Sequence, residues 1–237
     1  MKLEIAIHTH NYEKRLCWML SSILQQQGDI PSITVSIAYL PGTDSPSCEE
    51  VVVFFRNKGL NIIEVILRED EIHNRSVSRN IRASETTADW ILFADSDMVY
   101  DKHFFEDICK KLETDVRRNE TKVFGANRYS LDIPFCIKYF DEDTREYPCE
   151  IPDVASICSE WPVMWVKGAG IAPGNFQLAR VEAIKEKGGI YCGTKRDVWR
   201  RTKSDRGFRV HMGGRISLET LPQYHLNHDR LGPELQR

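Results

Sequence analysis

Short apolar runs and amphipathic segments alternate through the first 95 residues, and no other feature constrains the fold as strongly. Their periodicity distinguishes four strands from three helices. The predicted strands are residues 3–8, 33–40, 61–67 and 90–95, and the predicted helices are residues 13–27, 47–58 and 75–88. Strands that alternate with helices of this length form right-handed βαβ units. We therefore predict an α/β fold, in which helices flank a mostly parallel sheet.

The second half is less regular. Residues 129–170 contain four prolines and scattered aromatic residues, which is typical of loops and short strands. A helix is predicted at residues 176–187, ended by Gly188-Gly189, and residues 223–228 read as a strand. We see no linker, so we expect a single domain over residues 1–237.

Composition narrows the class of protein. The net charge of −3 predicts no general attraction to nucleic acid or to an anionic membrane. No apolar run approaches the roughly 20 residues that span a bilayer, so stable membrane insertion is not expected. The seven cysteines show no Cys-x-x-Cys spacing, which favours reduced thiols over a disulfide framework or a zinc site. We expect a cytoplasmic protein, either free or peripheral to a membrane.

Three segments lie at the carboxyl ends of predicted strands: His8-Thr9-His10, Tyr39-Leu40 and Asp95-Ser96-Asp97. In a parallel sheet, ligands bind beyond the carboxyl ends of the strands, where all three segments fall. Asp95 and Asp97 share a side if the strand persists through Ser96, and paired carboxylates suit Mg²⁺ or Mn²⁺. The alternative is that Asp97 caps a helix that starts near Asp101.

A second motif lies on the predicted helix before this strand. Ser78, Arg79 and Asn80 precede the acidic residues. The chain here resembles the inverting family 2 glycosyltransferases of the GT-A fold, in which a helix with Ala-Arg-Asn precedes a strand ending in a metal-binding Asp-x-Asp. Ser78 stands at the Ala position. The resemblance implies a GT-A domain, with residues 1–127 binding a nucleotide-sugar and residues 128–237 binding the acceptor.

The opening segment resembles the same family, whose first strand leads into Pro-Thr-Tyr-Asn. Thr9 and Asn11 match, and the resemblance implies that they contact the base or ribose. His8 and His10 replace the Pro and the Tyr. The family's Asp-Asp after the second strand is missing; Tyr39 stands there and could stack on a base.

Two further sets of roles follow. Asp44 could substitute for the missing Asp-Asp. Arg75 and Arg79 lie four residues apart on one helix face, so both could point at phosphates. In similar enzymes a C-terminal histidine completes the metal shell, and His225 is the candidate, with His228 as the alternative.

The metal roles are divided between the two aspartates. Asp97 is the first-choice ligand, and Asp95 is expected to contact the metal directly, through water, or through the ribose. An inverting transferase also needs a general base, which the family places in a Glu-Asp pair. Asp197 is the candidate, although Arg196 replaces the Glu, and a salt-bridged helix Asp is the alternative. Asp153 and Glu160 are the next carboxylates in line.

The segment 195–209 has seven basic residues against two acidic ones. It indicates either a solvated helix face or a contact with the diphosphate, an anionic acceptor or a membrane-linked carrier.

The function predicted from these features is metal-dependent, inverting transfer of a sugar from a nucleotide-sugar, with a UDP-sugar favoured and Mn²⁺ or Mg²⁺ as cofactor. The acceptor would be a glycan or another hydroxyl compound, including a lipid-linked one. One alternative is a nucleotidyltransferase, but that class has a Gly-rich basic loop near the first strand, and His8-Thr9-His10-Asn11 is not such a loop. The other alternative is a non-catalytic protein that binds carbohydrate or nucleic acid on the same fold.

Overall fold

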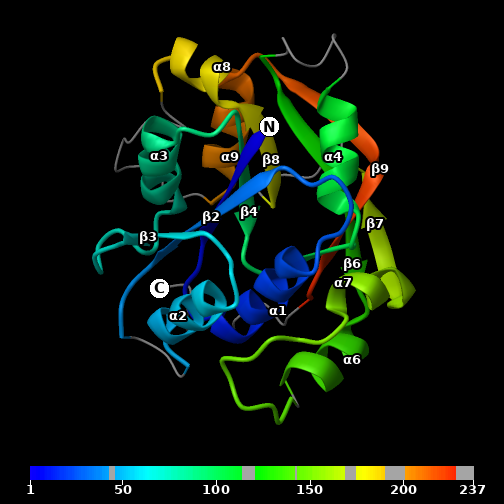
Figure 1. Ribbon diagram of the computed structural model, residues 1–237. Coiled ribbons are helices and arrows are strands. Elements are labelled where there is room, and N and C mark those ends of the chain that lie inside the picture. The colour runs from blue at the N-terminus through cyan, green and yellow to red at the C-terminus, as the bar shows by residue number, and fades with distance from the viewer. Residues whose placement is uncertain (43–45, 114–120, 142, 169–174, 190–200, 228–237) are drawn as a thin grey trace.

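A computed structural model describes residues 1–42, 46–113, 121–141, 143–168, 175–189 and 201–227 (Figure 1). In this part of the chain, the strands form one nine-stranded sheet in the order β3-β2-β1-β4-β8-β6-β9-β5, and β7 pairs with β6 beside that path. The strands are β1 Lys2–His8, β2 Ser32–Tyr39, β3 Ile62–Ile66, β4 Trp90–Asp95, β5 Met98–Tyr100, β6 Val123–Leu131, β7 Val163–Lys167, β8 Phe176–Arg180 and β9 Arg215–His225.

The direction of the strands differs between the two halves of the sheet. β1 pairs in parallel with β2 and β4, and β2 pairs in parallel with β3, as the alternation of elements predicts. The later strands are mixed: β8 runs antiparallel to β4, β7 to β6 and β5 to β9, whereas β6 and β9 are parallel. The α/β fold is confirmed, and the four strands of the first half that pair with one another, β1 to β4, do so only in parallel.

Helices cover both faces of this sheet (Figure 1). On one face the core includes residues of α1 Glu13–Leu24, α2 Cys48–Asn57 and α4 Phe104–Leu112. On the other it includes residues of α3 Arg75–Glu85, α8 Val181–Glu186 and α9 Arg201–His211. The shorter elements are α6 Ile133–Cys136, η1 Ile137–Asp141, α7 Val154–Ile157 and η2 Cys158–Glu160. None of the helices in the described ranges is long and apolar enough to cross a membrane.

The central strands are buried on both faces, which explains their continuous apolar sequence. Ile5 and Leu92 face the core with α1, and Ala6 and Phe93 face the core with α3. Each of the large side chains contributes about 1.5–3 kcal/mol through burial. This packing holds the carboxyl ends of β1 and β4 side by side, with His8 paired to Asp95.

The helix predicted at residues 176–187 is wrong in its first part. Residues 176–180 form β8, antiparallel to β4, and only Val181–Glu186 is helical. Phe176 and Leu178 face one core, whereas Ala179 faces the other. Periodicity alone does not distinguish such a doubly buried strand from a buried helix. The predicted glycine terminus is confirmed, because Gly189 has φ 68° and its N–H donates to the Ile184 carbonyl at 2.9 Å.

Candidate active site

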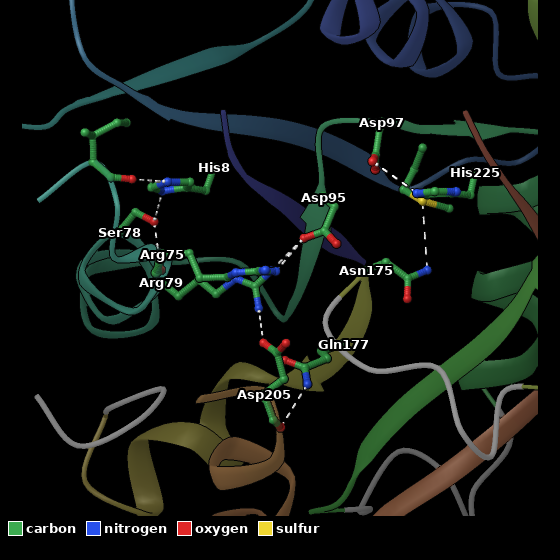
Figure 2. A network of polar contacts seen from close by, with 12 residues as sticks. His8, Arg75, Ser78, Arg79, Asp95, Asp97, Asn175, Gln177, Asp205 and His225 are labelled. Carbon is green, nitrogen blue, oxygen red and sulfur yellow. Dashed lines mark hydrogen bonds and ion pairs between the residues drawn. The ribbon is translucent and has the colours of Figure 1, made fainter. Parts of the chain in front are cut away.

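The acidic motif divides at a turn. β4 ends at Asp95, Ser96 and Asp97 form a turn, and β5 begins at Met98. The strand therefore does not persist through Ser96, and the two carboxylates contact different groups (Figure 2). The alternative role of Asp97 as a helix cap is wrong, because α4 begins only at Phe104.

Asp97 faces His225. Its Oδ2 lies 3.2 Å from His225 Nε2, and both side chains are largely buried (Figure 2). The sheet produces this contact, because His225 ends β9 and pairs with Met98, the residue that follows Asp97. The predicted strand near residue 225 is thus confirmed, and it brings together two residues that the sequence analysis assigned to one metal.

Asn227 determines which nitrogen of His225 carries the hydrogen. The Asn227 Nδ2 group donates to the Leu131 carbonyl, so its Oδ1 is the atom that lies 2.8 Å from His225 Nδ1. An amide oxygen only accepts, and His225 Nδ1 must therefore donate. In the neutral ring, Nε2 then directs its lone pair toward Asp97. Metal-binding histidines are commonly oriented in this way by an acceptor on the other nitrogen.

This donor set fits a divalent cation that also binds a substrate. One carboxylate oxygen and one imidazole nitrogen are ligands that Mn²⁺ accepts, and phosphates and water usually complete such shells. In the described ranges, no group of three or more His, Cys, Asp or Glu side chains gathers into a metal cluster. Asp97 and His225 thus offer two possible ligands, and a bound phosphate or water would have to supply the others.

Asp95 belongs to a second, cationic group. Its Oδ1 accepts from Arg75 Nη1 at 2.9 Å and from Arg79 Nη2 at 3.3 Å (Figure 2). Arg79 also donates through Nη1 to Asp205 Oδ1 at 2.8 Å, and it is only 2% exposed. Burial raises the pKa of Asp95, and the two guanidinium groups oppose this rise. Arg79 thus holds a carboxylate of β4 and a carboxylate of α9 on opposite sides of one guanidinium.

The arginines differ in access. Arg75 follows Asn74, whose side chain accepts from the Ser76 N–H at 3.1 Å and caps α3. Its side chain is 28% exposed, whereas Arg79 lies in the interior. Of the two residues predicted to reach phosphates, only Arg75 is open to solvent.

The loop after β1 places Thr9 and Asn11 near this edge of the sheet. The Thr9 N–H donates to the Ala38 carbonyl at 3.0 Å, and its buried Oγ1 has no hydrogen-bond partner in the described part of the chain. Asn11 is exposed and has φ 60°, a left-handed conformation that asparagine tolerates. Their predicted contacts with a base or ribose stay predictions.

Tyr39 takes a different position from the predicted one. It is 1% exposed within the main core, and its hydroxyl donates to Glu64 Oε2 at 2.6 Å. A ring packed on both faces offers no surface for a base, so the expected stacking role does not fit. Burial and the Glu64 carboxylate raise the pKa of Tyr39.

Several predicted residues lie outside the described ranges: Asp44, Asp197 and His228. Asp153 and Glu160, the next carboxylates in line, are exposed at α7 and η2. Sequence reasoning missed Asp205 and Asn227, because nothing local marks either residue. Their roles depend on contacts with Arg79 and Leu131, which are 126 and 96 residues away.

His8 connects the end of β1 to α3. Its Nε2 lies 2.7 Å from the Ile72 carbonyl oxygen, which only accepts, so Nε2 carries the hydrogen. Its Nδ1 lies 3.0 Å from Ser78 Oγ. Burial lowers the pKa of His8 to about 3, and the charges of Arg75 and Arg79 lower it further against the effect of the Ile72 bond. A neutral histidine therefore holds the helix that presents both arginines.

This neutral histidine predicts a pH-dependent stability. The folded-state pKa of about 3 lies below the ordinary value of 6.5, so the unfolded chain takes up the proton first as the pH falls. Its contribution is complete above pH 6.5 and is lost as the pH falls toward 3. From about pH 7.5 to about pH 5, we expect the free energy of unfolding to fall by about 1–2 kcal/mol more in the wild type than in His8→Gln, measured by urea unfolding. Equal losses would show that His8 titrates normally.

The sheet is parallel from β3 to β4, an acidic turn joins β4 to β5, and a histidine ends β9 beside β5. This arrangement is that of the GT-A class of glycosyltransferase folds, and similar solved structures agree. TarS residues 1–349 from S. aureus superposes with a TM-score of 0.64 at 18% identity, over 95% of this chain and 60% of that chain. TarS 1–349 in complex with UDP-GlcNAc superposes with a TM-score of 0.60 at 17% identity, over 100% of this chain and 63% of that chain. Mannosyltransferase PcManGT from Pyrobaculum calidifontis in complex with GDP-Man and Mn²⁺ superposes with a TM-score of 0.56 at 15% identity, over 96% of this chain and 57% of that chain.

The chain belongs to glycosyl transferase family 2, whose model matches residues 4–159. The family resemblance and the GT-A fold expected from the sequence are both confirmed. The chain spans 36% of the chain in another TarS structure and 57% of PcManGT, so it corresponds to a part of each. No curated protein sequence matches it significantly.

Proposed function

We propose that the chain transfers a sugar from a nucleoside diphosphate-sugar to a hydroxyl acceptor in a metal-dependent, inverting reaction. The observation that supports this most directly is the Asp97–His225 pair, 3.2 Å apart. Asn227 orients the imidazole so that a neutral ring turns its lone pair toward the carboxylate.

The residues divide the work of donor binding. Asp97 and His225 would hold Mn²⁺ or Mg²⁺, which when bound neutralises charge on the departing diphosphate. Arg75 lies at the solvent-facing start of α3 and would bind a phosphate oxygen. Asp95, positioned by the arginines, would contact the ribose or a water on the metal. Thr9 and Asn11 would meet the base or ribose, and the buried Thr9 hydroxyl has a bond left to make.

The donor and the acceptor are proposed as chemical classes of compound. UDP, UDP-GlcNAc and GDP-Man occupy structures of the same fold, and we favour a uridine donor. Asp197 is proposed as the general base that takes the proton of a glycan, lipid-linked or other hydroxyl acceptor. We propose action in the cytoplasm or at the periphery of a membrane. No observation favours a nucleotidyltransferase or a non-catalytic binding protein.

Calorimetry tests the metal dependence. UDP titrated into the protein with Mn²⁺ should bind about 10²-fold more tightly than in chelator, because carboxylates otherwise face phosphates without a cation between them. GDP serves as the comparison for base preference. Equal affinity with and without Mn²⁺ would rule out a shared cation at Asp97 and His225, whereas no binding of UDP or GDP would rule out the donor class.

A further inference from the structure

One face of strands β9, β6 and β7 continues outward from His225. The registers pair His225 with Ser130 and Ser130 with Trp165, and they pair Gln223 with Arg128 and Arg128 with Lys167. Paired residues on neighbouring strands share a face, and so do residues two apart on one strand. The face, here called the Arg128 face, therefore carries His225, Gln223, Ser130, Arg128, Trp165 and Lys167.

The Arg128 face holds two cations on paired positions of neighbouring strands, Arg128 and Lys167. The Arg128 guanidinium lies over the Trp165 ring, 4.9 Å from its centroid, and neither Arg128 nor Lys167 forms an ion pair with a described residue. Burial lowers the pKa of Arg128, opposed by the charges of Asp97 and Asp95. Burial also lowers the pKa of Lys167, and Arg128 and Arg209 lower it further. Cations that repel each other in a partly buried place are costly unless an anion joins them.

Polar atoms on the same face also lack partners. Ser130 and Gln223 are fully buried, and neither Ser130 Oγ nor the two amide atoms of Gln223 has a hydrogen-bond partner in the described ranges. Arg128 Nε is in the same condition. Buried polar groups are nearly always bonded to protein, water or ligand. Their grouping beside His225 leaves hydrogen bonds there that ordered water or a bound polar molecule would complete.

We propose that the Arg128 face binds an acceptor that carries a phosphate group, with Arg128 and Lys167 on the phosphate and the reacting hydroxyl directed toward Asp97 and His225. This inference rests on the proposed function, since it names the acceptor class of the same site. The donor diphosphate is a separate anion, whose charge the cation at Asp97 and His225 would neutralise. Arg128 and Lys167 therefore serve the second substrate.

The test compares matched charge removals. Arg128→Gln and Lys167→Gln each remove one cation from the face, and Lys110→Gln removes one from the outside of α4, where Lys110 is 62% exposed. Soluble probes are glycerol 3-phosphate and glucose 6-phosphate, each against glycerol or glucose, titrated by calorimetry with and without UDP and Mn²⁺. Vesicles of phosphatidylglycerol, against phosphatidylcholine, test a lipid-borne phosphate. Unfolding temperatures establish whether each variant folds. If Arg128→Gln does not fold, Lys167→Gln alone carries the test.

In the wild type, at least one phosphate probe should bind about tenfold or more tightly than its uncharged counterpart. Arg128→Gln and Lys167→Gln should each weaken that binding about tenfold. Lys110→Gln should bind the phosphate probe as the wild type does, and all three variants should keep the wild-type affinity for UDP. No preference for phosphate in the wild type, or equal binding by all variants, would overturn the proposal. So would a loss confined to UDP binding, which would assign the cations to the donor. The protein could also bind the phosphate probe through Arg128 but fail to bind UDP. That result would overturn the proposed donor, whereas the anion site on the Arg128 face would stand.

Discussion

Asp97→Asn is expected to abolish metal-dependent donor binding while the fold persists. Asparagine has nearly the same shape, but it removes the anionic ligand that faces His225 Nε2 at 3.2 Å. Mn²⁺-dependent UDP affinity should fall to the level seen in chelator. Transfer of sugar should fall by about 10³-fold, because stabilisation of the leaving diphosphate by a metal contributes several kcal/mol.

Calorimetry with Mn²⁺ and UDP measures the binding, and release of UDP measures the turnover. Asp107→Asn is the matched control, because Asp107 lies on α4 with a side chain that is 49% exposed. If Asp97→Asn binds UDP as the wild type does in Mn²⁺, the cation is held elsewhere and Asp97 has a structural role.

Arg79→Leu should cause the largest loss of stability. It leaves Asp205, which is 7% exposed, and Asp95, which is 34% exposed, without the guanidinium that lies between them. Breaking a buried charge pair on one side typically costs about 3–5 kcal/mol, and we expect about 3 kcal/mol because Asp95 keeps Arg75 and some solvent. Urea unfolding measures this loss.

The control is Arg68→Leu, which removes an arginine that is 74% exposed and paired with Glu71 at the surface; its urea midpoint should stay close to that of the wild type. Adding Asp205→Asn to Arg79→Leu should restore part of the loss, because it removes one uncompensated buried charge. Equal stability of the Arg79 and Arg68 variants would mean that the buried pairs do not support the fold.

Local patterns accounted for much of the first half of the fold. Apolar alternation and helical periodicity are properties of neighbouring residues, so the strands and helices before residue 95 lie close to their predicted bounds. The Ser78-Arg79-Asn80 motif on α3 and the Asp95-Ser96-Asp97 turn identified the family for the same reason. By contrast, the periodicity did not identify β8 as a strand, because burial on both faces gives a strand the apolar content of a buried helix.

The fold class, the family and the sheet edge that carries the candidate site could be predicted from the sequence, since these depend on element order and on residues close together in the chain. The contacts of the two carboxylates, by contrast, depend on the tertiary structure. A turn at Ser96 directs Asp95 to the arginines of α3 and Asp97 to His225, and Arg79 meets Asp205 across 126 residues. Such contacts arise from strand register and helix packing, which bring distant residues together and leave no periodicity in the sequence.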